Sequence, residues 1–336
     1  MFHLRRYVSD GPRRGGRVLV TAACLVAGLV AASAALHGQA LATVYLSVVD
    51  QKGVPVPSVE ASDIVVSEEA GRSTVQSVRA FSWPLKVTVL VDNGPRTDVS
   101  LVHYRTGLQK FFAGLPRAVP VSLIATAPNP RWLIRETTDR VQIEKGISRI
   151  TSDEGLGRFS DALIEYADRL SEEFQGVSRE QLQPYLPVLV SIATTHADGS
   201  LVRRASLANM ITLLRKHRVW TNLIMMSPAW SPTAPGELPA LEANGGQNAE
   251  IAKAVQELTR GSYVPITGSG TSALSSKILP ELAQQITLRD TRQMKQHRIV
   301  IERPAGAKGP MKNFAFALLN HPGAQFVVSA DGNVLP

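Results

Sequence analysis

Acidic side chains follow several predicted strands of this sequence, and they are the residues best suited to chemistry. The stretch LKVTVLVDNGPRTDVS, Leu85 to Ser100, reads as a buried strand that delivers Asp92 to a loop and then a helix. Further polar residues lie in loops expected at the same end of the sheet: Asp98, Asp153, Glu154, His196 and Asp198. Carboxylate oxygens are hard ligands that suit Mg²⁺ or Mn²⁺. These residues could therefore hold a divalent cation or form a contact face.

Arg96 and Trp230 add a cation and an aromatic ring to this face. Arg96 lies four residues after Asp92, and its guanidinium could take the place of a metal and pair with that carboxylate. The alternative is that Arg96 faces water. Trp230 lies in a proline-rich loop, 227–247, and loops of this length are often functional. The predicted partner-binding face comprises Asp92, Arg96, Asp98, Asp153, Glu154, His196, Asp198 and Trp230.

Other chemistries lack their sequence patterns. The histidines show neither HxxxH nor HExxH spacing, which disfavours a zinc hydrolase. The segment GSGTS, 268–272, has neither the lysine of a phosphate-binding loop nor the setting of a catalytic serine. Cys24, the only cysteine, lies in an apolar run near the N-terminus, which excludes thiol catalysis and cysteine zinc clusters elsewhere. No stripe of basic and aromatic residues indicates nucleic-acid binding.

Residues 1–42 read as an export segment. Five arginines against Asp10 give this segment +4 of the formal net charge of +8. An uncharged run of 19 residues, Val18 to Leu36, precedes Ala40-Leu41-Ala42, which fits the small-x-small cleavage pattern. The run is also long enough to span a bilayer, so the segment is either a cleaved signal peptide or an uncleaved anchor. Either way, the rest of the chain is expected to be periplasmic, secreted or anchored at the inner membrane facing outward.

The remaining sequence divides into three parts by its periodicity. Residues 43–83 alternate as short strands and form a small β module. Residues 84–290 alternate apolar strands with helices, which predicts a Rossmann-like, doubly wound α/β fold with a mostly parallel sheet and helices on both faces. Residues 291–336 read again as strands, and we expect them to pack with 43–83 as one small β domain.

These features together resemble the bacterial von Willebrand factor A-related family. The resemblance covers nearly all of residues 43–336 and rests on the order and spacing of several segments: VVDQKGVPVPSVEASDIVVSEEAG, KVTVLVDNG, EGLGRFSDALIEYADRL, VLVSIATTHADGS and VQELTRGSYVPI. It implies a Rossmann-like domain set between β segments. It further implies binding of another protein or a matrix component, completed by a divalent metal where one is present.

The family's metal site survives here at one position. That site uses Asp-x-Ser-x-Ser after the first strand, a threonine before a DAL-like helix and an aspartate after the fourth strand. Asp92 matches the first aspartate, whereas the serine positions hold Gly94 and Arg96. The threonine position is Gly157, and the last aspartate position is Thr194. The resemblance therefore implies a degenerate metal-ion-dependent adhesion site with Asp92 as its remnant.

These observations favour an exported, non-enzymatic protein-binding or scaffold protein that acts without metal. Its partner would be a protein or a cell-envelope component, and its contact loops would be 92–98, 152–159, 194–200 and 227–247. We expect no nucleic-acid partner, and membrane contact only through the N-terminal segment if it stays uncleaved. Two alternatives use the same face: a metal-dependent adhesion protein, with Mg²⁺ or Mn²⁺ held by the loop acids, and an exported hydrolase.

Overall fold

A computed structural model describes residues 40–68, 71–175, 185–195, 198–201, 204–228, 239–259, 261–290, 295–307 and 314–327. Within these ranges the side chains of residues 96, 98, 99, 228, 239–246, 268, 269 and 327 are not described. The predicted export segment lies outside the described residues except for its last three positions, 40–42. Among the helices of the described residues, none is both long and apolar enough to cross a membrane.

The larger part of the molecule alternates strands with helices, because its strands are apolar runs and its helices carry apolar stripes. The strands are β4 (Leu85–Val91), β5 (Val121–Ala125), β6 (Arg131–Thr137), β7 (Leu186–Thr194), β8 (Trp220–Pro228) and β9 (Ser262–Gly268). The helices are α2 (Leu101–Gly114), α3 (Arg140–Ser148), α4 (Phe159–Glu173), α5 (Arg204–Lys216), α6 (Pro239–Thr259) and α7 (Leu279–Leu288).

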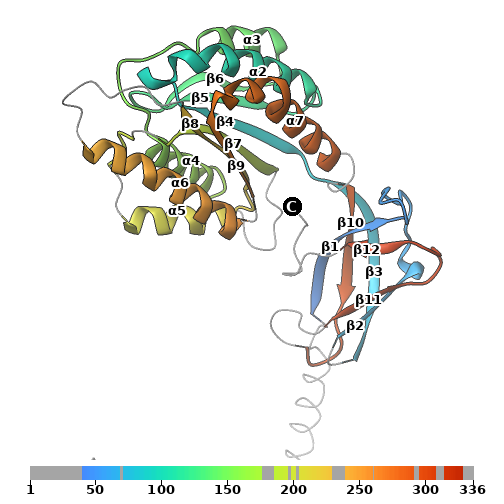
Figure 1. Cartoon of the computed structure of the whole chain (residues 1–336). Coiled ribbons are helices and arrows are strands. Elements are labelled where there is room, and N and C mark those ends of the chain that lie inside the picture. The colour runs from blue at the N-terminus through green and yellow to red at the C-terminus, as the bar shows by residue number, and fades with distance from the viewer. Residues whose placement is uncertain are drawn as a thin grey trace, which may run out of the picture.

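The six strands form one sheet in the order β6-β5-β4-β7-β8-β9. All neighbours are parallel except β5 and β6, which pair antiparallel at the edge. Helices α2, α3 and α7 pack on one face and α4, α5 and α6 on the other, each layer with its own apolar core (Figure 1). This is a doubly wound sheet, in which ligands commonly bind beyond the carboxyl ends of the strands.

Strands from both ends of the chain form a second, antiparallel sheet in the order β11-β2-β3-β10-β1-β12 (Figure 1). Its strands are β1 (Leu41–Val49), β2 (Ile64–Glu68), β3 (Gly71–Ser82), β10 (Lys295–Glu302), β11 (Ala315–Leu318) and β12 (Gln325–Val327). A separate apolar cluster centred on Leu46, Val66 and Ile299 holds this sheet together. The predicted fold class, a doubly wound α/β part with a small β part made from both terminal segments, is confirmed.

Trp83 joins the two parts at the point where β3 leads into β4. Its side chain is 1% exposed and belongs to the core cluster of the α/β part. Its ring also contacts Tyr45 of β1 and Phe81 of β3, with centroid separations of 5.5 and 5.0 Å. The indole Nε1 donates a hydrogen bond of 2.9 Å to Oε1 of Gln296 in β10. One aromatic residue therefore contacts side chains from both parts.

Three local predictions differ from the structure. The predicted module boundary at residue 42 falls inside β1, where Leu41 and Ala42 pair with Glu302 and Ile301. The predicted loop 227–247 is too long, because α6 already begins at Pro239, and proline favours the first turn of a helix. The helix predicted at 275–290 opens with a π-helical turn, Leu274–Ile278, before α7.

Candidate functional site

Asp92 follows β4 at the carboxyl edge of the sheet, and two residues of the chain, Gly94 and Thr194, hold its side chain. The carboxylate is buried, with the residue 6% exposed. Its Oδ1 accepts a 3.0 Å hydrogen bond from the backbone N–H of Gly94, and its Oδ2 accepts a 2.7 Å bond from the hydroxyl of Thr194. Thr194 ends β7, the neighbouring parallel strand. The hydroxyl at the family's second aspartate position is thus the partner of Asp92.

The backbone before α4 lies directly against this carboxylate. A Cβ atom added at Gly157 would lie 2.3 Å from Oδ1 of Asp92, closer than real Cβ atoms approach such a group. A Cβ added at Gly94 would lie 3.1 Å from the backbone N of Gly157. Glycine is therefore required at 157 for this close approach. A threonine here, as in the family pattern, would need the loop to move.

Burial sets the electrostatics of the site. It raises the pKa of Asp92, although the hydrogen bonds from Gly94 and Thr194 act in the opposite direction. Burial also raises the pKa of Asp198, which accepts hydrogen bonds from the Ser200 hydroxyl at 2.7 Å and the Ser200 N–H at 2.9 Å. The charge of Asp92 raises the pKa of Asp198 further, so the two carboxylates lie near enough to interact. The site therefore holds two buried acids whose pKa values are both raised by burial.

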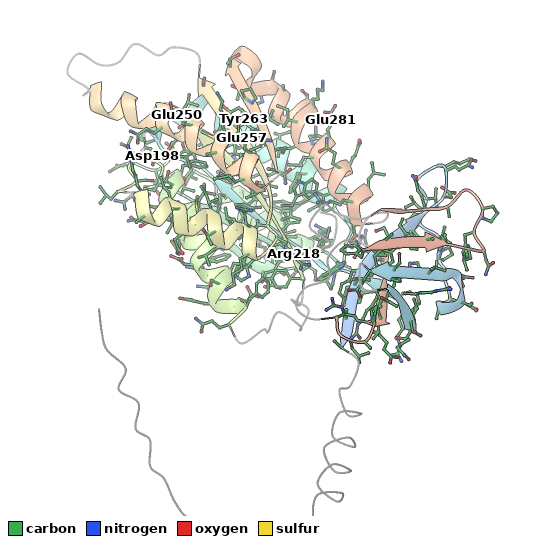
Figure 2. All side chains as sticks on the ribbon, turned by 90° about the horizontal axis from the view of Figure 1, so that it is seen from below. Asp198, Arg218, Glu250, Glu257, Tyr263 and Glu281 are labelled. Carbon is green, nitrogen blue, oxygen red and sulfur yellow. The ribbon has the colours of Figure 1, made fainter. Side chains whose placement is uncertain are left out.

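The structure brings together only some of the residues predicted for the contact face. Asp198 lies beside the site at the end of the α/β part that faces away from the small β sheet (Figure 2). Asp153 forms an ion pair with Arg131 at 3.1 Å, and Glu154 is exposed. His196, Trp230 and the side chains of Arg96 and Asp98 lie outside the described residues. The pairing of Asp92 with Arg96 therefore stays a prediction, while Thr194 and Gly94 already satisfy the carboxylate.

Two of the residues predicted for the contact face are buried and are not available to a partner. Asp92 and Asp198 are 6% and 4% exposed, so their side chains support the loops from inside. The reason is that each acid accepts hydrogen bonds from neighbouring backbone and hydroxyl groups, which makes burial of a carboxylate tolerable. A partner at this edge would therefore touch the surrounding loops, including the exposed Glu154 and the half-exposed Asp153.

The residues present do not fit an octahedral magnesium ion. The cavity beside the carboxylate has a volume of about 10 Å³, which is room for about one water molecule. It is lined by Asp92, Gly94, Pro95, Thr97, Leu156, Gly157 and Thr194. The hydroxyl of Thr97 already donates to the carbonyl of Gly94 at 2.7 Å. Among the described residues no group of three or more His, Cys, Asp or Glu side chains could hold a metal.

Asn93 is a structural residue of this site that the sequence did not single out. Its side chain is fully buried, and its Oδ1 accepts a 3.0 Å hydrogen bond from the N–H of Ala127. Its Nδ2 donates to the carbonyl of Thr151 at 2.9 Å, and its own carbonyl accepts from the N–H of Asp153. One amide thus fastens the loops that follow β4, β5 and α3. Apart from its place beside Asp92, no sequence pattern indicated this role.

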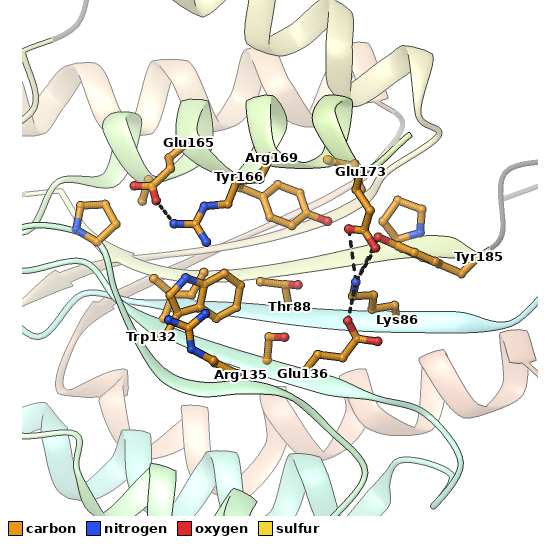
Figure 3. A pocket seen from close by; sticks show the side chains of 16 residues that line it. Lys86, Thr88, Trp132, Arg135, Glu136, Glu165, Tyr166, Arg169, Glu173 and Tyr185 are labelled. Carbon is orange, nitrogen blue, oxygen red and sulfur yellow. Dashed lines mark hydrogen bonds and ion pairs between the residues drawn. The ribbon is translucent and has the colours of Figure 1, made fainter. Parts of the chain in front are cut away.

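A larger pocket lies elsewhere, on the sheet face between α4 and the edge strand β6 (Figure 3). Its volume is about 350 Å³, within the range of small-molecule sites. The floor carries Lys86 and Thr88 of β4 and Ser122 of β5. Polar residues at alternate positions of otherwise apolar strands were the available sequence signal, because they indicate a face that a helix does not fully cover. Sequence reasoning missed this pocket.

The strand order, strand directions and helix layers decide the fold assignment. Counted along the α/β part, the strands run in the doubly wound order 3-2-1-4-5-6, with the buried aspartate after the first strand of the part. This part has a von Willebrand factor A-type fold. The degenerate metal site of the VWA-type part stays a prediction, which the misfit to magnesium supports.

The chain is similar to several solved structures at low sequence identity. A von Willebrand factor type A protein from Catenulispora acidiphila is 10% identical, with 87% of this chain and 72% of that chain covered and a TM-score of 0.45. The conserved hypothetical protein BatB from Bacteroides thetaiotaomicron is 14% identical, with 60% and 97% covered and a TM-score of 0.40. An aerotolerance-related membrane protein from Bacteroides fragilis is 13% identical, with 60% and 99% covered and a TM-score of 0.38.

These likenesses concern the fold only, and the fold assignment rests on the topology described above. No protein-family model matches the sequence, and the search of curated proteins finds no match.

Replacing Asp92 by asparagine is expected to stabilise the protein increasingly as the pH rises. Burial raises the pKa of Asp92 in the folded protein above its usual value. At pH values between the unfolded and the folded pKa, the native state therefore binds more protons than the unfolded state. Wild-type stability therefore falls as the pH rises through the folded pKa, by about 1.4 kcal/mol per unit of difference between the two pKa values. The asparagine oxygen can accept from the Gly94 N–H and its NH₂ can donate to the Thr194 hydroxyl, while the bond from the Thr194 N–H is lost at every pH.

Urea unfolding of Asp92→Asn and wild type from about pH 4 to pH 8 measures this difference. Asp168→Asn on the outer side of α4 is a suitable control, because Asp168 is exposed. A difference in unfolding free energy that does not change with pH would contradict the raised pKa of Asp92.

Proposed function

We propose that the chain is an exported, non-enzymatic protein-binding or scaffold protein of the VWA type that binds its partner without a divalent metal. The observation that supports this most is that Gly94 and Thr194 donate hydrogen bonds to the two carboxylate oxygens of Asp92. A carboxylate with both oxygens satisfied inside the protein does not need a cation. The arginine-rich, apolar N-terminal segment supports export.

The loops at the carboxyl edge of the sheet suit a binding face because they are fastened to one another. Asn93 ties the loops after β4, β5 and α3, as described above. The N–H of Gly199 donates to the carbonyl of Gly157 at 2.9 Å, and the N–H of Asp161 donates to the Ser200 hydroxyl at 3.2 Å. Binding to such preorganised loops costs less conformational entropy than binding to loose ones. A partner protein or envelope component is the ligand we propose for this face.

A catalytic role finds little support among the described residues. Ser275 and His103 do meet, with 3.4 Å between Oγ and Nδ1. This separation is longer than a nucleophile–base hydrogen bond, and the Ser275 hydroxyl also lies 3.1 Å from the carbonyl of Ser272, to which it donates. The serine lies within the π-helical turn before α7, and its side chain is buried. We therefore place binding ahead of hydrolysis.

Calorimetric titration of the full chain with Mg²⁺ and Mn²⁺ tests metal independence. We expect no saturable heat up to about 5 mM of either ion, because the cavity beside Asp92 has room for about one water molecule. We also expect equal thermal stability in EDTA and in either ion. Asp92→Ala serves as the control variant. Saturable binding that Asp92→Ala abolishes would overturn metal independence and favour the metal-dependent adhesion protein.

A further inference from the structure

The pocket between α4 and β6 is lined by residues of α4 and of strands β4, β5 and β6. Helices α4, α5 and α6 share a core cluster with strands β4, β5, β7 and β8, and Trp132 of β6 packs against that cluster. Trp132 also lines the pocket, together with Ser122 and Ile124 of β5. Figure 3 shows α4 along one wall and the strands along the opposite wall, with the Arg169 guanidinium over the Trp132 ring. A site of about 350 Å³ is large enough for a small organic ligand.

At one end of the pocket, the ammonium group of Lys86 is fully paired with neighbouring side chains. The Lys86 ammonium lies 2.6 Å from Glu136 and 2.9 Å from Glu173, and it donates to the Tyr185 hydroxyl at 3.2 Å. The same ammonium lies 4.5 Å from the centre of the Tyr185 ring. Its side chain is 13% exposed. Because two carboxylates share this one cation, Lys86 is not available to an incoming anion.

The Trp132 end carries the opposite balance of charge. Two guanidinium groups lie near the indole ring, Arg169 at 4.9 Å and Arg135 at 6.0 Å from its centre. Arg169 is paired with Glu165 one turn away on α4. Within the part of the chain that the structure describes, Arg135 makes no hydrogen bond and no ion pair. Two arginines against one glutamate leave a net charge of +1 here, beside an aromatic ring.

We propose that this pocket binds a small organic acid, whose carboxylate pairs with Arg135 and whose aromatic or apolar body packs against Trp132. The guanidinium fork matches a carboxylate with two parallel N–H···O bonds, which makes arginine the natural partner for such a group. Ile124 and Leu170 provide apolar lining for the body of the ligand. The site is separate from the loop face around Asp92, and the proposal does not depend on the proposed function.

The test uses the full chain labelled with 5-fluorotryptophan and titrated with 3-phenylpropionate. Trp132 is one of four tryptophans, and its ¹⁹F resonance is assigned from the Trp132→Phe variant. We expect saturable movement of the Trp132 resonance and none from 3-phenylpropionamide, which has the same body without the charge. Added salt should weaken the binding, because the guanidinium side chain is exposed.

Arg135→Gln tests the role of the Arg135 guanidinium. We expect it to weaken 3-phenylpropionate binding about tenfold or more, as for loss of a charge-assisted hydrogen-bond pair. The matched control is Arg149→Gln, an exposed arginine at the end of α3 that does not line the pocket and should leave binding unchanged. The proposal is overturned by no saturable shift up to about 10 mM acid, by equal binding of the amide, or by equal affinities of the two variants.

Discussion

Replacing Arg303 by methionine is expected to destabilise the small β part by about 3 kcal/mol. Arg303 follows β10 and contacts both carboxylate oxygens of Glu68 at the end of β2. Its Nη2 donates to Oε2 at 2.8 Å, and its Nε lies 3.1 Å from both Oε1 and Oε2. The two side chains are 8% and 3% exposed, and the hydroxyl of Ser73 donates to the same carboxylate at 3.2 Å. Without its cation, Glu68 would be a buried, unpaired charge.

A double substitution separates loss of the pair from loss of the charge. Glu68→Leu combined with Arg303→Met removes both charges and keeps most of the apolar volume, so it should cost much less than either single change. Urea unfolding of the four proteins in the cycle measures the coupling. If Arg303→Met alone cost under about 1 kcal/mol, the pair would behave like a surface salt bridge, and its burial would carry no energetic weight.

Replacing Trp83 by alanine is expected to cost about 3–5 kcal/mol of unfolding free energy. The side chain is 1% exposed and contacts Tyr45 and Phe81 on one side and the core of the α/β part on the other. Truncation would leave a cavity at the junction. It would also remove the N–H that bonds to Gln296, whose Nε2 has no partner among the described residues.

Trp83→Phe is the informative control for this prediction. Phenylalanine keeps most of the buried ring and loses the hydrogen bond, so its cost should be smaller, about 1–3 kcal/mol. Circular dichroism and urea unfolding of both variants give the comparison. A Trp83→Ala protein as stable as wild type would show that the contacts between the two parts contribute little to stability.

Asp92 accepts hydrogen bonds from within the protein, whereas the matching aspartate of the family pattern binds a cation. In the family pattern, hydroxyl and carboxylate oxygens surround a cation. Here Gly157 places backbone against the carboxylate, and Thr194 supplies a hydrogen-bond donor at the second aspartate position. The same edge of the sheet is thereby held together by internal hydrogen bonds. This arrangement supports binding by shape and loop contacts, as we propose.

The fold could be predicted from the sequence because its strands are buried on both faces. Runs such as Leu85–Val91 and Leu186–Thr194 are almost continuously apolar, and this pattern is typical of a strand between two helix layers. The terminal segments alternate with a period of two, which predicts an antiparallel sheet with one covered face. Helix starts were less certain, and the start of α6 at Pro239 was missed because the proline-rich stretch before it reads as a loop.

By itself, the sequence determined the doubly wound α/β fold, the β part built from both ends, and the place of Asp92 at the end of the first strand of the α/β part. Each of these follows from local periodicity and chain order. Only the tertiary structure decided that Thr194, 102 residues away, is the partner of Asp92, and that Asn93 fastens three loops. It alone showed the pocket beside Trp132. The physical reason is that hydrogen-bond partners and cavities depend on how distant side chains pack, which no local pattern encodes.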